Sequence, residues 1–429
     1  MGESYVVAIL LGISVGTVSG LLPGFGNLIS MLLLFPFISH WNPIEIFLCY
    51  AALTQISQFV GSLTTLYTGI PGETSSMPVV IESKKLNSEQ LPYTVAATAI
   101  GSTVAGIFAT IFCLLLIPYL IGISWFYRTE MAVVLLLVTS FLIVTFEPQK
   151  KSVSLTLLML GVLLGMIGWN NTFSTGILTF GIMEMYQGIP LELVMIFLFA
   201  VPQLLQISNY SPDWKKIAFQ WRWPRLKWTS IFGHSVVGFI GGLVPGMTTV
   251  LSSQWSYAIS SRLSANPYDR IVASETANNA GAISQLIPML VIGLPLVASE
   301  ALTLALMEAK GFLATPEAAA SIILTVTPLF LMISIAGGLL AWPLANYLLG
   351  ILRVNGKLLR KIILGILLTT VFFQAYNNHV LLFYTAVSAA LIPIAWLIRN
   401  HNTIPLVFGF LISSKIWDNS IRLFDIYLL

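Results

Sequence analysis

Four side chains that could bind an ion lie beside apolar segments of the chain. Glu73 directly follows a Pro-Gly pair, and Glu275 is closely followed by the amides Asn278 and Asn279. A carboxylate with amide oxygens can hold Na⁺, and a carboxyl group can carry a proton; ionisable groups inside a membrane are costly and usually functional. We therefore predict a coupling-ion site at Glu73, Glu275, Asn278 and Asn279. The alternative that each carboxylate lies at the membrane interface or pairs with a buried donor stays open.

Proline motifs interrupt the apolar segments at matching places in the two halves of the chain. Pro23 and Pro245 each precede a glycine and lie 222 positions apart, and Pro71 and Pro295 lie 224 positions apart. Two motif pairs in the same order and at nearly the same offset indicate an internal duplication. Proline lacks an N–H group and glycine adopts unusual backbone angles, so each motif predicts a break in a membrane helix.

A broken helix leaves unpaired backbone groups that can bind ions. Carbonyls at the end of the first segment suit a cation, and N–H groups at the start of the next segment suit an anion. Paired breaks in two halves indicate the binding site of a transporter. The predicted substrate-binding residues are Pro23, Gly24, Phe25, Gly26, Asn27, Gly72, Glu73, Thr74, Ser75, Ser76, Pro245, Gly246, Met247, Thr248 and Thr249. The alternative that proline only kinks a long helix is favoured for one motif, but not for two motifs repeated in register.

The composition identifies the broad class of protein. Of the 429 residues, 57% are hydrophobic and 9% are charged, and the mean hydropathy is +0.89, whereas a soluble domain carries about 25% charged residues. We therefore expect a multi-pass protein of the lipid bilayer without a sizeable soluble domain. The net charge of +3 is too small to indicate a nucleic-acid partner. Cys49 and Cys113 lack metal-ligand spacing, so no metal site and no cofactor are predicted.

Basic residues divide the chain and orient it. Residues 209–228 form a basic connector between a first membrane repeat, 1–208, and a second membrane repeat, 229–429. Placing the connector and the other basic loops in the cytoplasm follows the positive-inside rule. Corresponding loops of the two halves then lie on opposite faces, which predicts inverted repeats with both termini outside. The expected fold is all-α, with broken or re-entrant helices and roughly 10–14 membrane segments.

Enzyme signatures are missing from the sequence. The chain has no Gly-x-Ser-x-Gly, His-Glu-x-x-His or P-loop motif, so we expect no enzyme and no intrinsic ATPase activity. The N-terminal Met-Gly-Glu-Ser-Tyr has no basic region before the first apolar segment, so no cleaved signal peptide is predicted.

Several motifs taken together resemble those of a known family. The pattern Gly-x-x-x-Gly-x-x-Pro-Gly-x-Gly spans residues 16–26, Ile-Pro-Gly-Glu-x-Ser-Ser spans residues 70–76, and Glu-x-Ala-Asn-Asn-Ala spans residues 275–280. Thr-Phe-Gly, Gly-Ile and Leu-Phe-Ala patterns follow one another within residues 179–200. With these motifs the chain resembles the large membrane subunit of the tripartite tricarboxylate transporters.

The resemblance implies a secondary transporter, a permease of the cytoplasmic (cell) membrane that carries a tricarboxylate or dicarboxylate anion by symport with Na⁺ or H⁺. It also implies two partners, a periplasmic binding protein and a small membrane subunit. The chain departs from the family pattern at Thr248 and Leu296, where the motifs have glycine. Two alternatives therefore stay open, the transport of another small anion and a transport-inactive membrane scaffold or assembly subunit.

Overall fold

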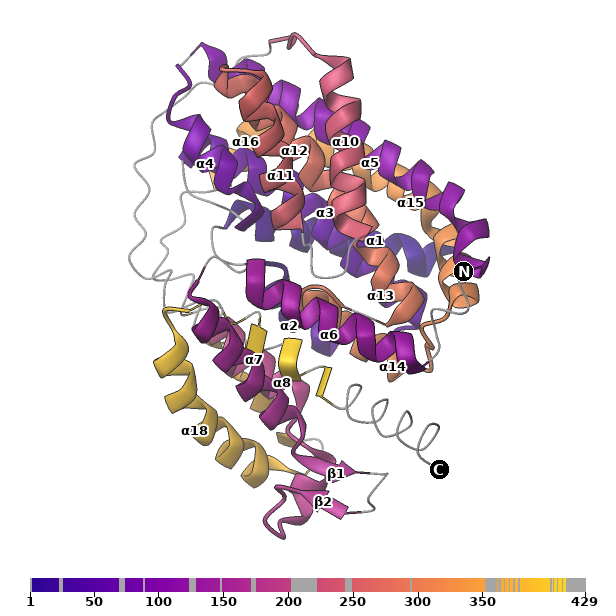
Figure 1. Ribbon diagram of the computed structural model, residues 1–429, viewed down its shortest axis with the longest axis vertical. Coiled ribbons are helices and arrows are strands. Elements are labelled where there is room, and N and C mark those ends of the chain that lie inside the picture. Colours follow the sequence, from indigo (N-terminus) through magenta and orange to yellow (C-terminus); the bar gives the residue numbers. More distant parts are fainter. Residues whose placement is uncertain are drawn as a thin grey trace.

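The computed structural model is helical almost throughout (Figure 1). The structure describes most of the chain, namely residues 2–22, 26–68, 74–87, 89–122, 129–146, 149–170, 175–201, 222–243, 249–293, 295–351, 361 and most of 364–413. Within these residues, the strands form one two-stranded antiparallel sheet, β1 (Gly168–Asn170) and β2 (Thr175–Ile177). The expected all-α class is confirmed.

Five helices of the described residues are long and apolar enough to cross a membrane. The candidate spans are Ser4–Leu21, Pro43–Tyr67, Gln90–Tyr119, Pro316–Ala341 and Leu381–Ile398. Because a helix needs about 20 apolar residues to cross the hydrocarbon core, several crossings are present and the expected polytopic membrane protein is confirmed. The number of membrane segments and the inversion of the repeats stay predictions.

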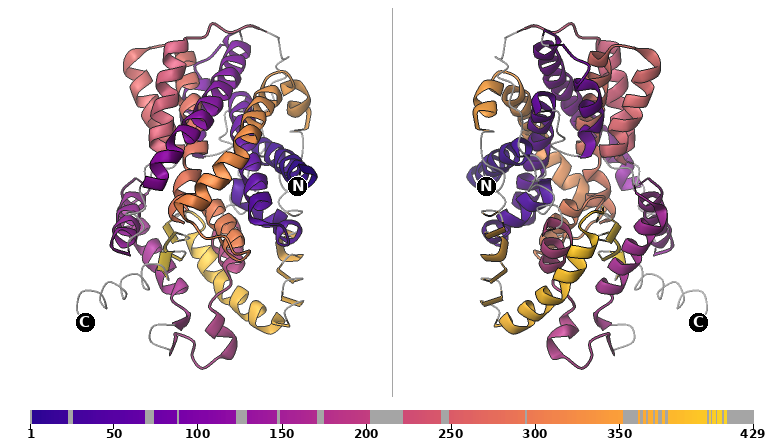
Figure 2. Two further views of the ribbon diagram at one scale, coloured as in Figure 1. Left: turned by 90° about the vertical axis from the view of Figure 1, so that its right-hand side faces the viewer. Right: turned by 90° about the vertical axis from the view of Figure 1, so that its left-hand side faces the viewer.

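The described helices form one group before the connector and one after it, and the two groups interlock because α5 packs against α12 and α15 packs against α3 and α5. The first group comprises α1 (Gly2–Leu21), α2 (Gly26–Ile38), α3 (Pro43–Thr68), η1 (Thr74–Ser76), α4 (Met77–Ser83), α5 (Gln90–Gly122), α6 (Thr129–Phe146), α7 (Lys151–Gly165), η3 (Met183–Gln187), α8 (Leu191–Val194) and η4 (Met195–Ala200). The second comprises α10 (Trp228–Leu243), α11 (Thr249–Leu263), α12 (Pro267–Ser284), α13 (Leu286–Ile292), α14 (Ala298–Glu308), α15 (Pro316–Ala341), α16 (Ala345–Ile351) and α18 (Leu381–Ile398). Figure 2 shows α10 and α11 at one end of the molecule, and α18 with the β-hairpin at the other.

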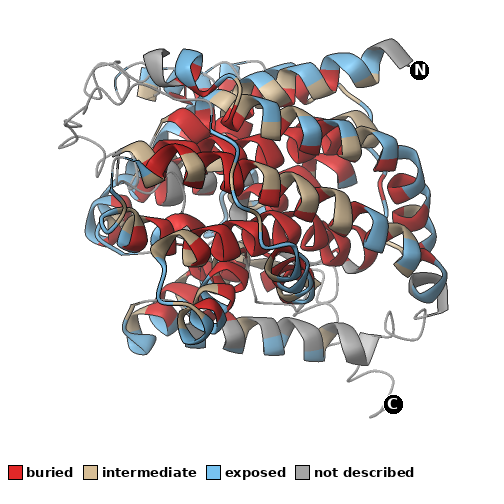
Figure 3. Ribbon diagram, turned by 90° about the horizontal axis from the view of Figure 1, so that it is seen from above, coloured by how far each residue is buried: buried red, intermediate tan, exposed pale blue. Residues whose placement is uncertain are grey.

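Helix α12 is a polar helix in the interior of the protein. Every residue from Ile271 to Ser284 is buried, and the buried parts of the chain gather in the middle of the molecule (Figure 3). Helices α3, α5, α10 and α11 pack around α12. A helix that is buried on all sides and still carries carboxylate and amide groups must satisfy those groups with its neighbours, because unpaired polar groups are costly in an apolar interior.

Glycines let two pairs of helices approach each other closely. A Cβ atom at Gly16 of α1 would lie 2.5 Å from the carbonyl oxygen of Leu53 on α3, and one at Gly238 of α10 would lie 2.6 Å from the Cα atom of Ala277 on α12. Ordinary carbon contacts are about 3.5–4.0 Å, so only glycine fits. Gly16 and Gly238 are 222 positions apart, and Leu53 and Ala277 are 224 apart. The two contacts therefore recur at the offsets of the proline motifs.

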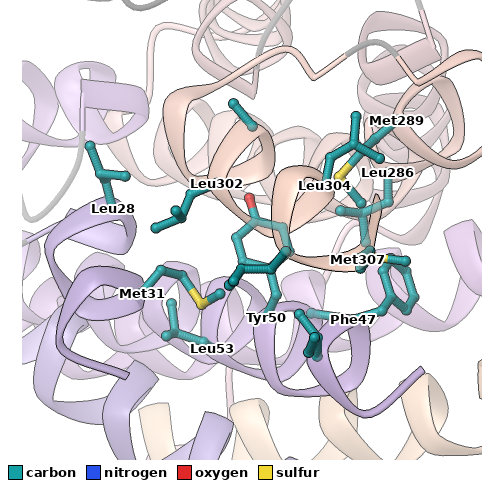
Figure 4. Close-up of a cluster of buried hydrophobic side chains, with 14 of the residues drawn as sticks. Leu28, Met31, Phe47, Tyr50, Leu53, Leu286, Met289, Leu302, Leu304 and Met307 are labelled. Carbon is teal, nitrogen blue, oxygen red and sulfur yellow. The ribbon is translucent and has the colours of Figure 1, made fainter. Parts of the chain in front are cut away.

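A large hydrophobic cluster lies between α2, α3, α13 and α14 (Figure 4). Tyr50 of α3 is fully buried in it, and its hydroxyl pairs with the hydroxyl of Ser299 on α14 at 3.1 Å. Methionine side chains from the other three helices, Met31, Met289 and Met307, also belong to this cluster. The cluster joins elements that precede the connector to elements that follow it.

The described end of the basic connector is tied to the starts of two interior helices. The guanidinium of Arg222 donates to the hydroxyl of Tyr93 on α5 at 3.0 Å, and the ammonium of Lys227 binds the carboxylate of Asp269 on α12 at 2.6 Å. Most of the predicted connector, residues 209–221, lies outside the described residues. The part that is described therefore links α10 to both α5 and α12.

Candidate functional site

Helices end and restart at all four predicted breaks. Helix α1 ends at Leu21 and α2 begins at Gly26, whereas α10 ends at Leu243 and α11 begins at Thr249. The second pair of breaks separates α3 from η1 and α13 from α14. Nine predicted substrate-binding residues lie outside the described residues: Pro23, Gly24, Phe25, Gly72, Glu73, Pro245, Gly246, Met247 and Thr248. The structure therefore describes the helix ends on either side of each break, but not most of the break residues themselves.

The restart of α2 is anchored to α3. Gly26 has a φ of 61°, in the left-handed region that glycine adopts without a Cβ penalty. The next residue, Asn27, accepts a hydrogen bond on its Oδ1 atom from the hydroxyl of Ser57 at 2.6 Å. Two residues of the predicted site thus form the beginning of α2, and one of them contacts the middle of α3.

Gln58, the neighbour of Ser57 on α3, joins two further parts of the predicted site. Its Oε1 atom accepts hydrogen bonds from Nδ2 of Asn278 at 2.5 Å and from the hydroxyl of Ser75 at 3.3 Å. Ser75 follows the second break, and Asn278 lies 220 positions after Gln58 in the chain. Ser57 and Gln58 therefore connect the residues after two breaks with the polar helix α12, and we call this set of contacts the Gln58 junction.

The start of α11 reaches the same place. The hydroxyl of Ser253, one turn into α11, donates to the backbone carbonyl of Ser75 at 2.8 Å. Thr249, the first residue of α11, is buried, as are Ser75 and Ser76. Thr74 opens η1. The restart after the break in the second half thus packs against the restart after the second break of the first half.

The other predicted ion ligands lie beside the junction and face α3 and α5. The hydroxyl of Ser62, one turn beyond Gln58 on α3, donates to the carboxylate of Glu275. The Nδ2 atom of Asn279 donates to the hydroxyl of Ser102 on α5 at 2.8 Å. The adjacent amides of α12 therefore point to different neighbours, with Asn278 at the Gln58 junction and Asn279 at α5.

Sequence reasoning missed Gln55 as a site residue. Its side chain is 0% exposed, and neither its Nε2 nor its Oε1 atom has a hydrogen-bond partner among the described residues. The Oδ1 atom of Asn278 shares this property. Leaving a buried polar group unpaired costs about 1–3 kcal/mol, so these groups are available to a ligand. The signal in the sequence was the group of polar residues Gln55, Ser57 and Gln58 inside an apolar segment.

The fourth break has a structural carboxylate. Glu300, the third residue of α14, is fully buried, and its Oε2 atom accepts the backbone N–H of Leu296 at 2.7 Å. A carboxylate near the start of a helix that accepts backbone N–H groups of the preceding turn stabilises that helix start. Gly293 ends α13 with a φ of 60°. Glu300 therefore fixes the restart of α14 after this break.

His234 also has a structural partner. The hydroxyl of Ser256 on α11 donates to the backbone carbonyl of Ala273 at 2.7 Å and lies 2.7 Å from Nδ1 of His234. Because the hydroxyl has one hydrogen, Nδ1 of the imidazole must be the donor in the second contact. This hydrogen bond accounts for the burial of His234 between α10 and α11.

A buried charge cluster lies outside the candidate membrane spans, where α4 meets α11 and α12. The carboxylate of Glu82 accepts hydrogen bonds from Lys85 at 2.8 Å, from Tyr257 at 2.8 Å and from Arg270 at 3.1 Å. Burial raises the pKa of this carboxyl group, but the three donors outweigh burial and hold the pKa below its usual value. Tyr257 and Arg270 follow the connector, so this cluster also joins the two groups of helices.

Taken together, the fold and the site define a polytopic membrane protein whose interrupted helices meet at a buried polar junction. Residues 6–407 match the sequence model of the Tripartite tricarboxylate transporter TctA family. The chain belongs to this family.

One curated relative is an uncharacterized 52.8 kDa protein in the TAR-I ttuC' 3' region of Agrobacterium vitis. It is 26% identical over 306 residues, which cover 68% of this chain and 61% of that protein. The chain therefore matches less than two thirds of the relative's length. No solved structure matches the chain.

Proposed function

We propose that the protein is a membrane permease that carries a small tricarboxylate-like or dicarboxylate-like anion, driven by a cation gradient. Membership of the TctA family supports this substrate class. The observation that carries the proposal is the Gln58 junction, in which Asn27, Ser75 and Asn278 are tied to adjacent residues of α3. Residues that follow two separate helix breaks meet there, and helix restarts at membrane depth are sites where transporters bind anions.

The anion lies between the helix restarts of the two halves. Backbone N–H groups near Gly24 to Asn27 and near Gly246 to Thr249 hold its carboxylate groups, because the first N–H groups of a helix have no partner within that helix. The amide of Gln55 supplies a further donor and acceptor, since it is buried without a partner among the described residues. The coupling ion takes its ligands from among four residues, namely Glu73, Glu275, Asn278 and Asn279.

The two halves, residues 1–208 and 229–429, are structural repeats joined by a cytoplasmic connector. The recurrence of the α1–α3 contact in α10–α12, at the offset of the proline motifs, supports the duplication. An inverted arrangement brings the restarts toward each other from opposite faces of the cytoplasmic membrane. A periplasmic binding protein and a small membrane subunit complete the system, as the word tripartite in the family's description suggests.

A transport-inactive scaffold is the second candidate function, and one observation favours it. Leu296 stands in the fourth break and is 1% exposed, packed in an apolar cluster with Leu158 and Phe408. A leucine buried in this way fills space beside the break that a ligand would otherwise take. Transport of another small anion on the same scaffold is separated from carboxylate transport by competition with citrate and succinate.

Uptake by the purified protein in proteoliposomes tests the proposed function. Labelled citrate is supplied under imposed Na⁺ and H⁺ gradients, with and without the binding protein and the small subunit. Wild type should accumulate citrate, whereas Gly24→Val and Gly246→Val should abolish uptake without lowering expression, because a branched side chain blocks close approach of the backbone to the anion. Gly233→Ala is the matched control, since a Cβ atom at Gly233 meets nothing within 4 Å.

Two results would count against the proposal, and they differ in what they remove. Full uptake in both valine variants removes the assigned anion site but leaves the permease function. If the wild type takes up no carboxylate, even with both partner subunits present, the carboxylate function is refuted. Transport of another anion or a scaffold function is then favoured.

A further inference from the structure

A small internal cavity lies between α3, α5 and α15, one helical turn along α3 from the Gln58 junction. Its polar lining consists of three hydroxyl groups, from Ser62 on α3 and from Thr98 and Ser102 on α5. Apolar side chains such as Phe59 and Val95 form the rest of the wall. The cavity measures about 10 Å³, which is close to the space that one water molecule or one small ion occupies.

The carboxylate of Glu275 stands behind these hydroxyls. The hydroxyl of Ser62 donates its one hydrogen toward this carboxylate and the carbonyl oxygen of Gln58, so the lone pairs of the serine oxygen are left for another partner. Ser102 accepts the Nδ2 hydrogen of Asn279 at 2.8 Å. Glu275 and Asn279 are one turn apart on α12, and each contacts one of the hydroxyls that line the cavity. The cavity therefore has hydroxyl oxygens on its wall and a carboxylate in contact with that wall.

Thr98 differs from the other threonines of α5. The hydroxyls of Thr94, Thr103 and Thr110 each donate to the carbonyl oxygen four residues earlier in the helix. The hydroxyl of Thr98 has no hydrogen-bond partner among the described residues, although the residue is 3% exposed and lines the cavity. The Oδ1 atom of Asn279 has no partner among these residues either. A bound water molecule or ion would account for buried oxygens that are left unpaired in this way.

We propose that this cavity is the binding site of one dehydrated monovalent cation of the size of Na⁺. The hydroxyl oxygens of Ser62, Thr98 and Ser102 coordinate it, and the carboxylate of Glu275, which contacts Ser62 from behind the cavity wall, balances its charge. The inference rests on the proposed cation-driven transport, and it names the ion's ligands and moves the ion from the helix breaks to the α3–α5–α12 contact.

The charge and size of the site select this class of ion. One carboxylate balances one positive charge, whereas a divalent ion would leave an uncompensated charge in the apolar interior, which is strongly unfavourable. Mg²⁺ also keeps several of its water molecules, and a cavity of about 10 Å³ has no room for them. The hydroxyl ligands come from α3 and α5 and the balancing carboxylate comes from α12, so an ion bound there links the two halves of the chain.

Binding of ²²Na⁺ to the purified protein tests the site without any transported anion. Wild type should bind Na⁺ saturably, with weak competition by K⁺ and none by choline. Thr98→Val keeps the shape of the side chain and removes the hydroxyl, and it should weaken Na⁺ binding at least tenfold. Thr110→Val is the matched control on the same helix, because the Thr110 hydroxyl is already bonded to the carbonyl of Gly106, and it should bind Na⁺ as the wild type does.

The possible results separate this inference from the proposed function. Unchanged Na⁺ binding in Thr98→Val, or no saturable Na⁺ binding by the wild type, overturns the cavity site. If the wild type still accumulates citrate in the uptake assay after either of these results, the permease function stands and its coupling ion binds elsewhere. Loss of Na⁺ binding in Thr98→Val, together with no citrate uptake by the wild type, supports the cation site while it refutes the carboxylate function. Thermal unfolding of each variant without Na⁺ verifies that it is folded.

Discussion

The close contact between α10 and α12 predicts opposite effects for two glycine substitutions on the same helix. Gly238→Ala should destabilise the protein, because the new Cβ atom would lie 2.6 Å from the Cα atom of Ala277, about 1 Å inside an ordinary carbon contact. The opposing atoms belong to the backbone of α12 and cannot rotate away. Gly233→Ala should be neutral or stabilising, because a Cβ atom there meets nothing within 4 Å.

The size of the effect follows from two opposing contributions. Overpacking an interior contact costs typically about 1–3 kcal/mol, and a rigid backbone partner places Gly238→Ala at the upper end. Replacing glycine by alanine within a helix returns about 1 kcal/mol. The net loss for Gly238→Ala is therefore about 2 kcal/mol, whereas Gly233→Ala keeps the gain of up to about 1 kcal/mol.

A thiol-reactive dye measures these changes directly in detergent. Cys49 and Cys113 are the two cysteines of the chain and both are buried, so they react only when the protein unfolds on heating. The unfolding temperature should fall for Gly238→Ala and stay level or rise for Gly233→Ala. An unfolding temperature of Gly238→Ala equal to or above that of Gly233→Ala would refute the glycine-mediated contact.

Two further predictions concern polar contacts that cross between the halves. Glu82→Gln should lower stability at pH 7 by roughly 3 kcal/mol, because it leaves Arg270 without its buried partner. The pKa of Glu82 is lowered in the folded protein, so its contribution is present above the ordinary carboxyl range and is lost as the pH falls through the lowered value. Acid melting curves of wild type and variant should therefore converge once the pH lies below that lowered pKa. Gln58→Leu should reduce citrate uptake at least tenfold while the dye assay still reports a folded protein, because it removes the acceptor of Asn278 and Ser75; unchanged uptake would detach the junction from transport.

The membrane class and the positions of the helix breaks could be predicted from the sequence because both depend on local chemistry. A low share of charged residues decides the class, and proline with glycine decides where a helix stops. The predicted breaks at Pro23 and Pro245 agree with the observed ends of α1 at Leu21 and α10 at Leu243. Each of these features is set by residues that are neighbours in the chain.

The partners of the predicted polar residues could not be found in this way. Asn278 bonds to Gln58, 220 positions earlier, and no local pattern indicates such a pair. A single long apolar segment such as α3 also resembles an ordinary membrane span, although it carries Ser57, Gln58 and Ser62 on its length. Only the packing of α3 against α12 shows that these hydroxyl and amide groups belong to the site.

Comparing the two halves of the sequence at a fixed offset could have found one part of the site but not the rest. An offset of 224 carries Gln55 of α3 onto Asn279 of α12, so the missed residue stands at the position that corresponds to a predicted one. The same offset carries Ser57 onto Gly281, and a glycine has no side chain that could form a second junction. The halves are therefore alike in the glycine contacts that pack their helices, but unlike in the polar groups that α3 and α12 contribute. A site built from such halves is chemically asymmetric, and the residues that make it so must be identified from contacts between the halves.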